Sequence, residues 1–113
     1  MLYISVRDFL EKAAAAPRIT RDEERECARR MAEGDRNARE QIVMHYLPLT
    51  ASFVRRAPQE YRTLGLVYAC LQALEKAVDS FNFLQEGESF THRLSWVLRQ
   101  TTMHYIVTRR SGE

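Results

Sequence analysis

The sequence predicts an all-α fold, a compact bundle of five to six helices. Only 4 glycines and 3 prolines occur in 113 residues, and the abundant alanine, leucine, glutamate and arginine favour helices over sheet. Apolar residues recur at intervals of three and four along most of the chain, as on one face of a helix. With 45% hydrophobic residues, the chain suffices for one core, so we expect a single domain over residues 1–113.

The N-terminal part, residues 1–18, is expected to contain one helix. It covers about residues 5–15, and Pro17 ends it because proline cannot continue the backbone ladder. Residues 19–113 are expected to form the core helices. The apolar face of the N-terminal helix consists of Val6, Phe9, Leu10 and Ala13.

The next two helices have clear start signals. Thr20 and Glu23 have the spacing of a capping box, which predicts a helix that runs to about Glu33. Gly34 suits the left-handed closing position after it. Asp35 is a good N-cap for the following helix, whose apolar residues are Ile42, Val43 and Tyr46.

Two prolines and a long apolar pattern organise the middle of the chain. Pro48 suits the first turn of a fourth helix that continues through Val54. Pro58 marks the next connection. Residues 64–81 have a long helical pattern, whereas residues 82–89 have none and are predicted to be a loop.

Thr91 is expected to cap a last helix that runs to about Thr108. At about 100° per residue, its core sector contains Leu94, Leu98, Thr101 and Tyr105, flanked by Val97. Trp96 falls about 200° from Leu94 and therefore faces outward. Its neighbours on that outer face are His92, Arg99, Gln100, Met103, Val107 and Arg110, with Arg93 at the edge.

An outward tryptophan needs a cover or a ligand. From helix geometry alone, cover by another helix or a dimer partner is the favoured interpretation, nucleic-acid contact is second, and other binding is third. Residues 89–110 contain four arginines, two histidines and no acid, which suits phosphates and base edges while the indole stacks on an unpaired base. The net charge of +2 is too small to indicate such a partner by itself.

Several other classes of protein are disfavoured. Cys27 and Cys70 lie far apart without a CxxC companion, which is typical of free buried thiols in a reducing cytoplasm. The sequence has neither a signal peptide nor an apolar run of about 20 residues. His45, His92 and His104 lack metal-ligand spacing, and no catalytic motif is present. We therefore expect a cytoplasmic protein that is no enzyme and has no metal or cofactor.

The first half of the chain contains the blocks Val6-Arg-Asp-Phe-Leu10 and Ile19-Thr-Arg-Asp-Glu-Glu24. These blocks resemble bacterial RNA polymerase sigma factors of the sigma-70 family, in which the segment that contacts the non-template strand reads V-R-x-Y-L. Ile19-Thr-Arg-Asp-Glu-Glu24 and the stretch from Ala28 to Arg39 resemble L-T-x-E-E-E and A-x-x-I-x-x-G-D-x-x-A-R.

The resemblance continues in the same order to the last helix. Tyr46–Arg56 is similar to N-L-R-L-V-x-S-x-A-x-R, and Leu74–Phe81 to L-x-x-A-V-E-K-F. After one inserted residue, Ser89–Gln100 resembles K-F-S-T-Y-A-x-W-W-I-R-Q. The resemblance implies the helical domain of region 2, preceded by the short segment upstream of it.

It also implies a function, which is to dock on the clamp helices of the RNA polymerase core and capture the unwound promoter −10 strand. The family's base-contacting aromatic residues and its R-Q pair match Phe81, Phe90, Trp96, Arg99 and Gln100. The second tryptophan of the family pattern is Val97 here and a tyrosine position is Arg93, which removes part of the stacking wedge. His92 and Arg93 can partly compensate through phosphate contacts.

The polymerase-docking motif of the family, D-L-I-Q-E-G-N, corresponds to Gly65–Leu71 in this chain. The apolar frame is kept and every polar contact is lost, and such polar groups steer association and fix register. The positions expected to take part in docking are Leu66, Val67, Tyr68, Leu71 and Gln72.

Two hypotheses follow. The chain is a sigma-like initiation protein that binds polymerase and promoter DNA, or a degenerate sigma-derived interaction or regulatory module that does not melt promoters. The sequence has no −35-reading domain after the last helix, so a partner protein is expected to supply that function in the first case. Tyr68 and Leu71 favour the second if they are exposed, because they would form an apolar patch for another partner.

Overall fold

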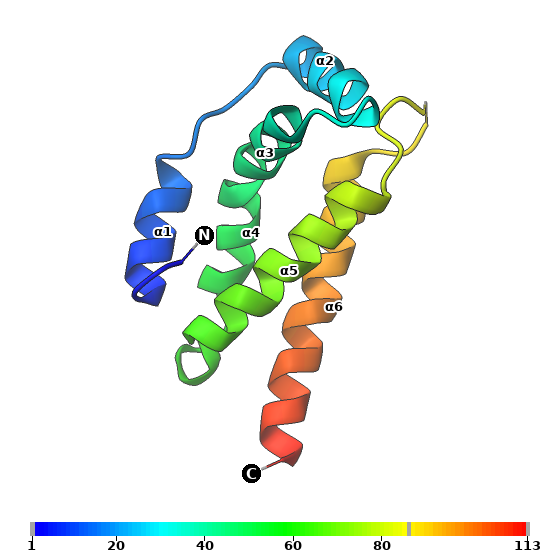
Figure 1. Ribbon diagram of the computed structural model, residues 1–113. Coiled ribbons are helices and arrows are strands. Elements are labelled where there is room, and N and C mark those ends of the chain that lie inside the picture. The colour runs from blue at the N-terminus through cyan, green and yellow to red at the C-terminus, as the bar shows by residue number, and fades with distance from the viewer. Residues whose placement is uncertain (1, 86, 113) are drawn as a thin grey trace.

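The computed structural model describes residues 2–85 and 87–112, and within these ranges it confirms an all-α bundle without strands (Figure 1). The elements in order are α1 (Val6–Ala14), α2 (Arg21–Ala32), α3 (Arg36–His45), α4 (Leu47–Arg56), the 3-10 helix η1 (Gln59–Tyr61), α5 (Leu64–Ser80) and α6 (Phe90–Ser111). The helix boundaries lie within a few residues of those predicted.

The start of α2 is the predicted capping box. Thr20 Oγ1 accepts the Glu23 amide at 3.1 Å, and the Glu23 carboxylate accepts the Thr20 amide at 2.7 Å. Each bond satisfies an amide that the helix itself leaves unpaired. Gly34, at a φ of 95°, turns the chain, and Asp35 caps α3 through the Ala38 amide.

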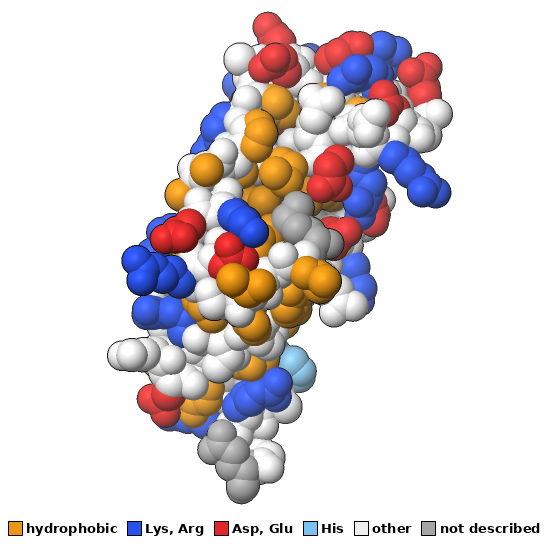
Figure 2. Space-filling model, turned by 60° about the vertical axis from the view of Figure 1, so that its left-hand side comes forward, with side chains coloured by type: hydrophobic (Ala, Val, Ile, Leu, Met, Phe, Trp, Pro, Cys, Tyr) orange, Lys and Arg blue, Asp and Glu red, His pale blue; other side chains and the backbone are white. Residues whose placement is uncertain are grey.

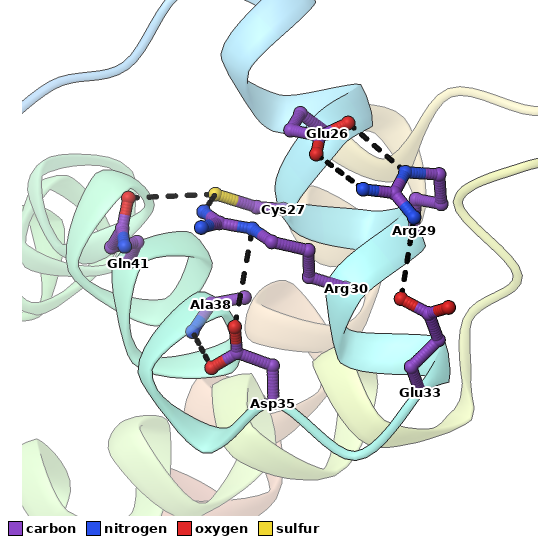
Figure 3. A network of polar contacts seen from close by, with 8 residues as sticks. All are labelled: Glu26, Cys27, Arg29, Arg30, Glu33, Asp35, Ala38 and Gln41. Carbon is purple, nitrogen blue, oxygen red and sulfur yellow. Dashed lines mark hydrogen bonds and ion pairs between the residues drawn. The ribbon is translucent and has the colours of Figure 1, made fainter.

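Side chains also tie α2 to α3 near this turn (Figure 3). Arg30 on α2 lies 4.0 Å from the Asp35 carboxylate, and its guanidinium donates to the sulfur of Cys27. The Cys27 thiol in turn donates to the side-chain oxygen of Gln41 on α3, at 3.5 Å. Both cysteines of the chain are free and buried, as the sequence predicts.

Tyr46 ends α3 and begins α4 almost without a connection, and Pro48 occupies the first turn of α4. At this position the missing N–H of proline costs nothing. Pro58 then precedes η1, which leads into α5.

The α5 and α6 helices run side by side in opposite directions, and α1 packs against α4 (Figure 1). The core lies between these elements. Its largest fully buried side chains are Phe9, Ile42, Leu47, Leu66, Leu74, Leu94 and Leu98. Within the described part of the chain, no helix is long and apolar enough to cross a membrane.

The beginning of α6 differs from the prediction. Ser89 caps it by accepting the His92 amide at 3.3 Å, so Thr91 lies inside the first turn and the predicted cap is wrong. The earlier start places Phe90 at the first helical position, where its ring is buried. Burial of an aromatic ring contributes more than the choice between two hydroxyl caps.

Candidate nucleic-acid interface

The outer face of α6 is the candidate interface. Leu94 and Leu98 are fully buried, whereas Trp96 is 60% exposed, which confirms the predicted orientation of the helix. Arg99 and Gln100 are exposed beside Trp96. No helix in the described part of the chain covers the indole, so the interpretation that another helix of this chain packs on it is wrong.

Charge on this face is uncompensated. Arg99 makes no ion pair or hydrogen bond with any residue that the structure describes, and α6 contains no acid. A free guanidinium beside an exposed indole is able to contact a phosphate while the ring stacks on a base.

Arg93 has a different environment from Arg99. Its guanidinium donates to both carboxylate oxygens of Glu88, at 2.8 Å each, and lies 6.0 Å from the centre of the Phe81 ring. A phosphate contact by Arg93 would therefore compete with Glu88 for this guanidinium. His92 is exposed in the first turn of α6.

An aromatic cluster joins the end of α5 to the start of α6. The rings of Phe81, Phe83 and Phe90 lie 4.7 to 5.1 Å apart, and Tyr46, at the junction of α3 and α4, contacts Phe90. The sequence reasoning did not select Phe83, although its position two residues after Phe81 in a mostly polar loop was an available signal.

Phe90, expected to contact DNA, is only 5% exposed. Its ring supports Phe81 and Phe83, which are both half-buried, and direct base contact by Phe90 does not fit this burial. Beside the cluster is a groove lined by polar groups of α2 and of the loop before α6. Its charged and polar lining includes Arg21, Arg25, Gln85, Ser89 and Thr91.

Tyr46 lines the same groove and connects it to α2. Its hydroxyl donates to the carboxylate of Glu24. Burial raises the pKa of Tyr46 well above its ordinary value, and the bond to Glu24 raises it further. The phenol therefore stays a hydrogen-bond donor at neutral pH.

The positions expected to dock on polymerase all lie on α5, but some are buried and others reach the surface. Leu66 and Val67 are fully buried and belong to the core, so their side chains do not form a surface. Tyr68 and Leu71 are half-buried, and Gln72 is exposed. These three side chains line one groove with residues of α3.

Tyr68 also holds the N-terminal segment. Its hydroxyl oxygen accepts the Tyr3 amide at 2.9 Å, although the two residues lie 65 positions apart. The hydroxyl lies within 3.4 Å of the Tyr3 carbonyl oxygen, to which it donates. On this side of the molecule, hydrophobic side chains form a band between charged ones (Figure 2).

Gly65 occupies the first position of the docking motif, where the family has an acid. A Cβ atom at this position would lie 2.5 Å from the Tyr105 hydroxyl on α6. The same hydroxyl is hydrogen-bonded to Thr63 at 2.6 Å. Glycine therefore allows α5 and α6 to approach closely, and a larger side chain here would collide with Tyr105.

Among the described residues, no group of three or more histidine, cysteine or acidic side chains is placed to hold a metal ion. Burial raises the pKa of Cys70 to about 11, partly offset by its contact with Thr102. This thiol is thus protonated and unreactive at neutral pH.

The all-α bundle is consistent with the fold of a sigma-type domain. The family model for Sigma-70 factor, region 1.2, matches residues 5–37, which contain α1, α2 and the turn into α3. Together with the relative described next, this match supports a fragment of the sigma-70 family.

One relative to which the chain is similar is RNA polymerase sigma factor SigA of Clostridium acetobutylicum, with 31% identity over 102 residues. The similarity covers 89% of this chain and 27% of the relative, so the chain spans about a quarter of the length of that protein. No solved structure matches the chain.

Proposed function

We propose that the protein is a sigma-like transcription initiation protein, which binds the RNA polymerase core and the −10 strand of an opened promoter. The observation that carries this proposal is the exposed Trp96 beside the unpaired Arg99 on an acid-free helix. The similarity to sigma-70 family proteins supports it. Initiation would take place in the cytoplasm, with the polymerase.

In this proposal Trp96 stacks on an unpaired base, Gln100 contacts a base edge, and Arg99 contacts a phosphate. Stacking on an aromatic side chain contributes about 1–3 kcal/mol per base. A duplex hides the base faces, so this mode requires the opened strand. Phe81 and Phe83 border the polar groove next to α6 and are the second candidate stacking surface.

Binding to single-stranded −10-like DNA tests the DNA part of the proposal. Trp96 is the only tryptophan in the sequence, so stacking should quench the fluorescence of the protein. We expect Trp96→Ala, followed by fluorescence anisotropy of labelled DNA, to weaken binding about 5- to 150-fold, which corresponds to the energy of one stacked base. Arg99→Ala should reduce the slope of log affinity against log salt by about 0.7.

Ile4→Ala is the matched control, because Ile4 is an exposed apolar side chain outside α6. Unchanged affinity and an unchanged salt slope in both α6 variants would contradict the DNA part of the proposal. Circular dichroism spectra should be the same for all three variants, since each changes an exposed side chain.

Docking on the polymerase is proposed through Tyr68, Leu71 and Gln72. The test is capture of purified core RNA polymerase by the tagged protein at low salt, compared with Gln72→Glu and with the control Ile4→Ala. Lack of capture at low salt would count against an initiation role.

The second candidate is a degenerate sigma-derived regulatory module that does not melt promoters. It is favoured by Tyr68, which stands at a docking position and uses its hydroxyl to hold Tyr3 within the same chain. A protein that neither captures the core enzyme nor binds the single strand, but retains a stable fold, would support this candidate.

A further inference from the structure

The C-terminal half of α6 carries a second exposed surface, beyond Trp96. Met103 is 54% exposed and Val107 is 56% exposed. They lie seven and eleven residues after Trp96, so at about 100° per residue both fall within about 20° of the same line along the helix. We call Met103 and Val107, with the half-buried Ile106 at their edge, the apolar strip.

The strip is fixed in place because the opposite face of α6 is anchored. Tyr105 bonds to Thr63 at the start of α5, and the Arg109 guanidinium lies 4.1 Å from the centre of the Tyr105 ring. The strip therefore lies on a rigid helix. It occupies the C-terminal part of α6, which extends past the start of α5 (Figure 1).

Thioether and isopropyl groups do not suit phosphate or base-edge contacts, which need hydrogen-bond donors and acceptors. They suit the apolar side of a helix, which contacts a partner through residues spaced by three, four and seven positions. The distance from Trp96 to Val107 is about 16 Å along the axis, or about three helical turns.

The charges around the strip indicate the charge of the partner that it fits. Arg99 and Arg110 lie on one edge and His104 lies on the other, by the same helical angles. Neither arginine has an ion-pair partner within the described residues, and no acid occurs between residues 89 and 111. A second copy of the strip would bring like charges together, which costs several kcal/mol across an interface.

We infer that the apolar strip binds an amphipathic helix of a partner protein, whose apolar face is flanked by aspartate or glutamate. The partner helix packs on Met103 and Val107, and its carboxylates pair with Arg99 and Arg110. This site goes beyond the proposed capture of the −10 strand, because Met103, Val107 and Arg110 do not contact DNA in that proposal and only Arg99 is shared by the two sites.

Two fluorescent peptides of about 18 residues, a length that allows partial helix formation, test the inference. Both have leucines spaced by three and four; one has glutamates on the flanks and the other has lysines. The glutamate peptide should bind the whole protein, and the lysine peptide should bind at least tenfold more weakly. Equal binding of the two peptides would overturn the inference.

Met103→Ser combined with Val107→Ser should weaken binding of the glutamate peptide at least tenfold and leave single-stranded DNA binding unchanged. Ile4→Ser is the matched control. Arg110→Glu should reduce the difference in affinity between the two peptides, because only Arg99 then remains to pair with the glutamates. All of these side chains are exposed, and unchanged circular dichroism verifies that the variants fold.

Two results would overturn the inference while leaving the proposed function intact. If the double serine variant loses DNA affinity to the same extent as Trp96→Ala, the strip is part of the DNA site. If sedimentation shows a dimer that the double serine variant abolishes, the strip binds a second copy. Conversely, peptide binding without DNA binding would contradict the proposed function and leave this inference intact.

Discussion

Phe90 and Trp96 lie six residues apart on α6 and have opposite surroundings. Phe90 is buried among aromatic rings from the α3–α4 junction, the end of α5 and the loop before α6, whereas the Trp96 indole is exposed to solvent. Family resemblance alone assigns both to DNA contact. The burial distinguishes a residue that shapes the site from one that is available to a base.

His45 provides a prediction at the same scale. Its Nδ1 accepts the Ile19 amide at 3.1 Å, which attaches the segment before α2 to α3. Burial lowers the pKa of His45 and the nearby Arg18 lowers it further, while Glu24 opposes them. In the folded protein the ring therefore stays neutral to a lower pH than in the unfolded chain.

Because the unfolded chain binds the proton first, the free energy of unfolding should decrease as the pH falls below about 6.5, the ordinary value for histidine. Urea unfolding between pH 7.5 and 5 measures this decrease. His45→Gln should remove part of it, whereas His92→Gln, an exposed control, should retain it. An identical pH dependence in both variants would exclude the proposed role of His45.

At the scale of elements, the crossing of α5 and α6 depends on Gly65. Alanine favours a helix by about 1 kcal/mol over glycine, yet a Cβ atom here would lie 2.5 Å from the Tyr105 hydroxyl. Overpacking of this kind typically costs about 1–3 kcal/mol. We therefore expect the collision with Tyr105 to cancel the helix-propensity gain of Gly65→Ala and to destabilise the packing of α5 against α6.

A double-mutant cycle measures the collision. In the Tyr105→Phe background the hydroxyl is absent, and Gly65→Ala should become neutral or stabilising. The coupling between the two sites should be about 1–3 kcal/mol in the free energy of unfolding by urea. Additive effects would mean that α6 shifts to accommodate the methyl group.

The elements themselves could be predicted well because their signals are local. The Thr20–Glu23 capping box, the Gly34 turn and the Asp35 cap depend on residues within four positions of one another. Ser89 was missed because the choice between it and Thr91 depends on where the Phe90 ring packs, and this is decided by residues of distant elements.

Site residues were predicted less completely than the helices. The outward face of α6 follows from helical geometry, and the structure confirms it for Trp96. The pairing of Arg93 with Glu88 and the burial of Leu66 and Val67 depend on the loop and on tertiary packing. Spacing within one helix contains neither kind of information.

Contacts between distant parts of the chain hold the helices of the whole molecule together. Arg39 on α3 donates to Asp79 on α5 at 2.6 and 2.9 Å and reaches Glu75 at 3.3 Å. The bond to Arg39 holds the pKa of Asp79 below its ordinary value. Tyr68 likewise connects α5 to the segment before α1, so α5 organises both the N-terminal helix and the α2–α3 hairpin.

This arrangement gives a prediction for Tyr68. Tyr68→Phe keeps the packing of the ring and removes the oxygen that accepts the Tyr3 amide. We expect the free energy of unfolding to decrease by about 0.5–1.5 kcal/mol, the usual contribution of one hydrogen bond. Amide exchange should accelerate at Tyr3 and in α1, because local opening becomes easier.

Tyr61→Phe is the matched control, because the half-buried Tyr61 hydroxyl makes no hydrogen bond with any described residue. Trp96 fluorescence and single-stranded DNA affinity should stay unchanged in both variants, since Trp96 lies on the exposed outer face of α6. Equal exchange rates at Tyr3 in the two variants would show that the ring packing alone holds the N-terminal segment. Faster exchange in Tyr68→Phe only would show that Tyr68, at a docking position of the family, stabilises the N-terminal segment of this chain through its hydroxyl.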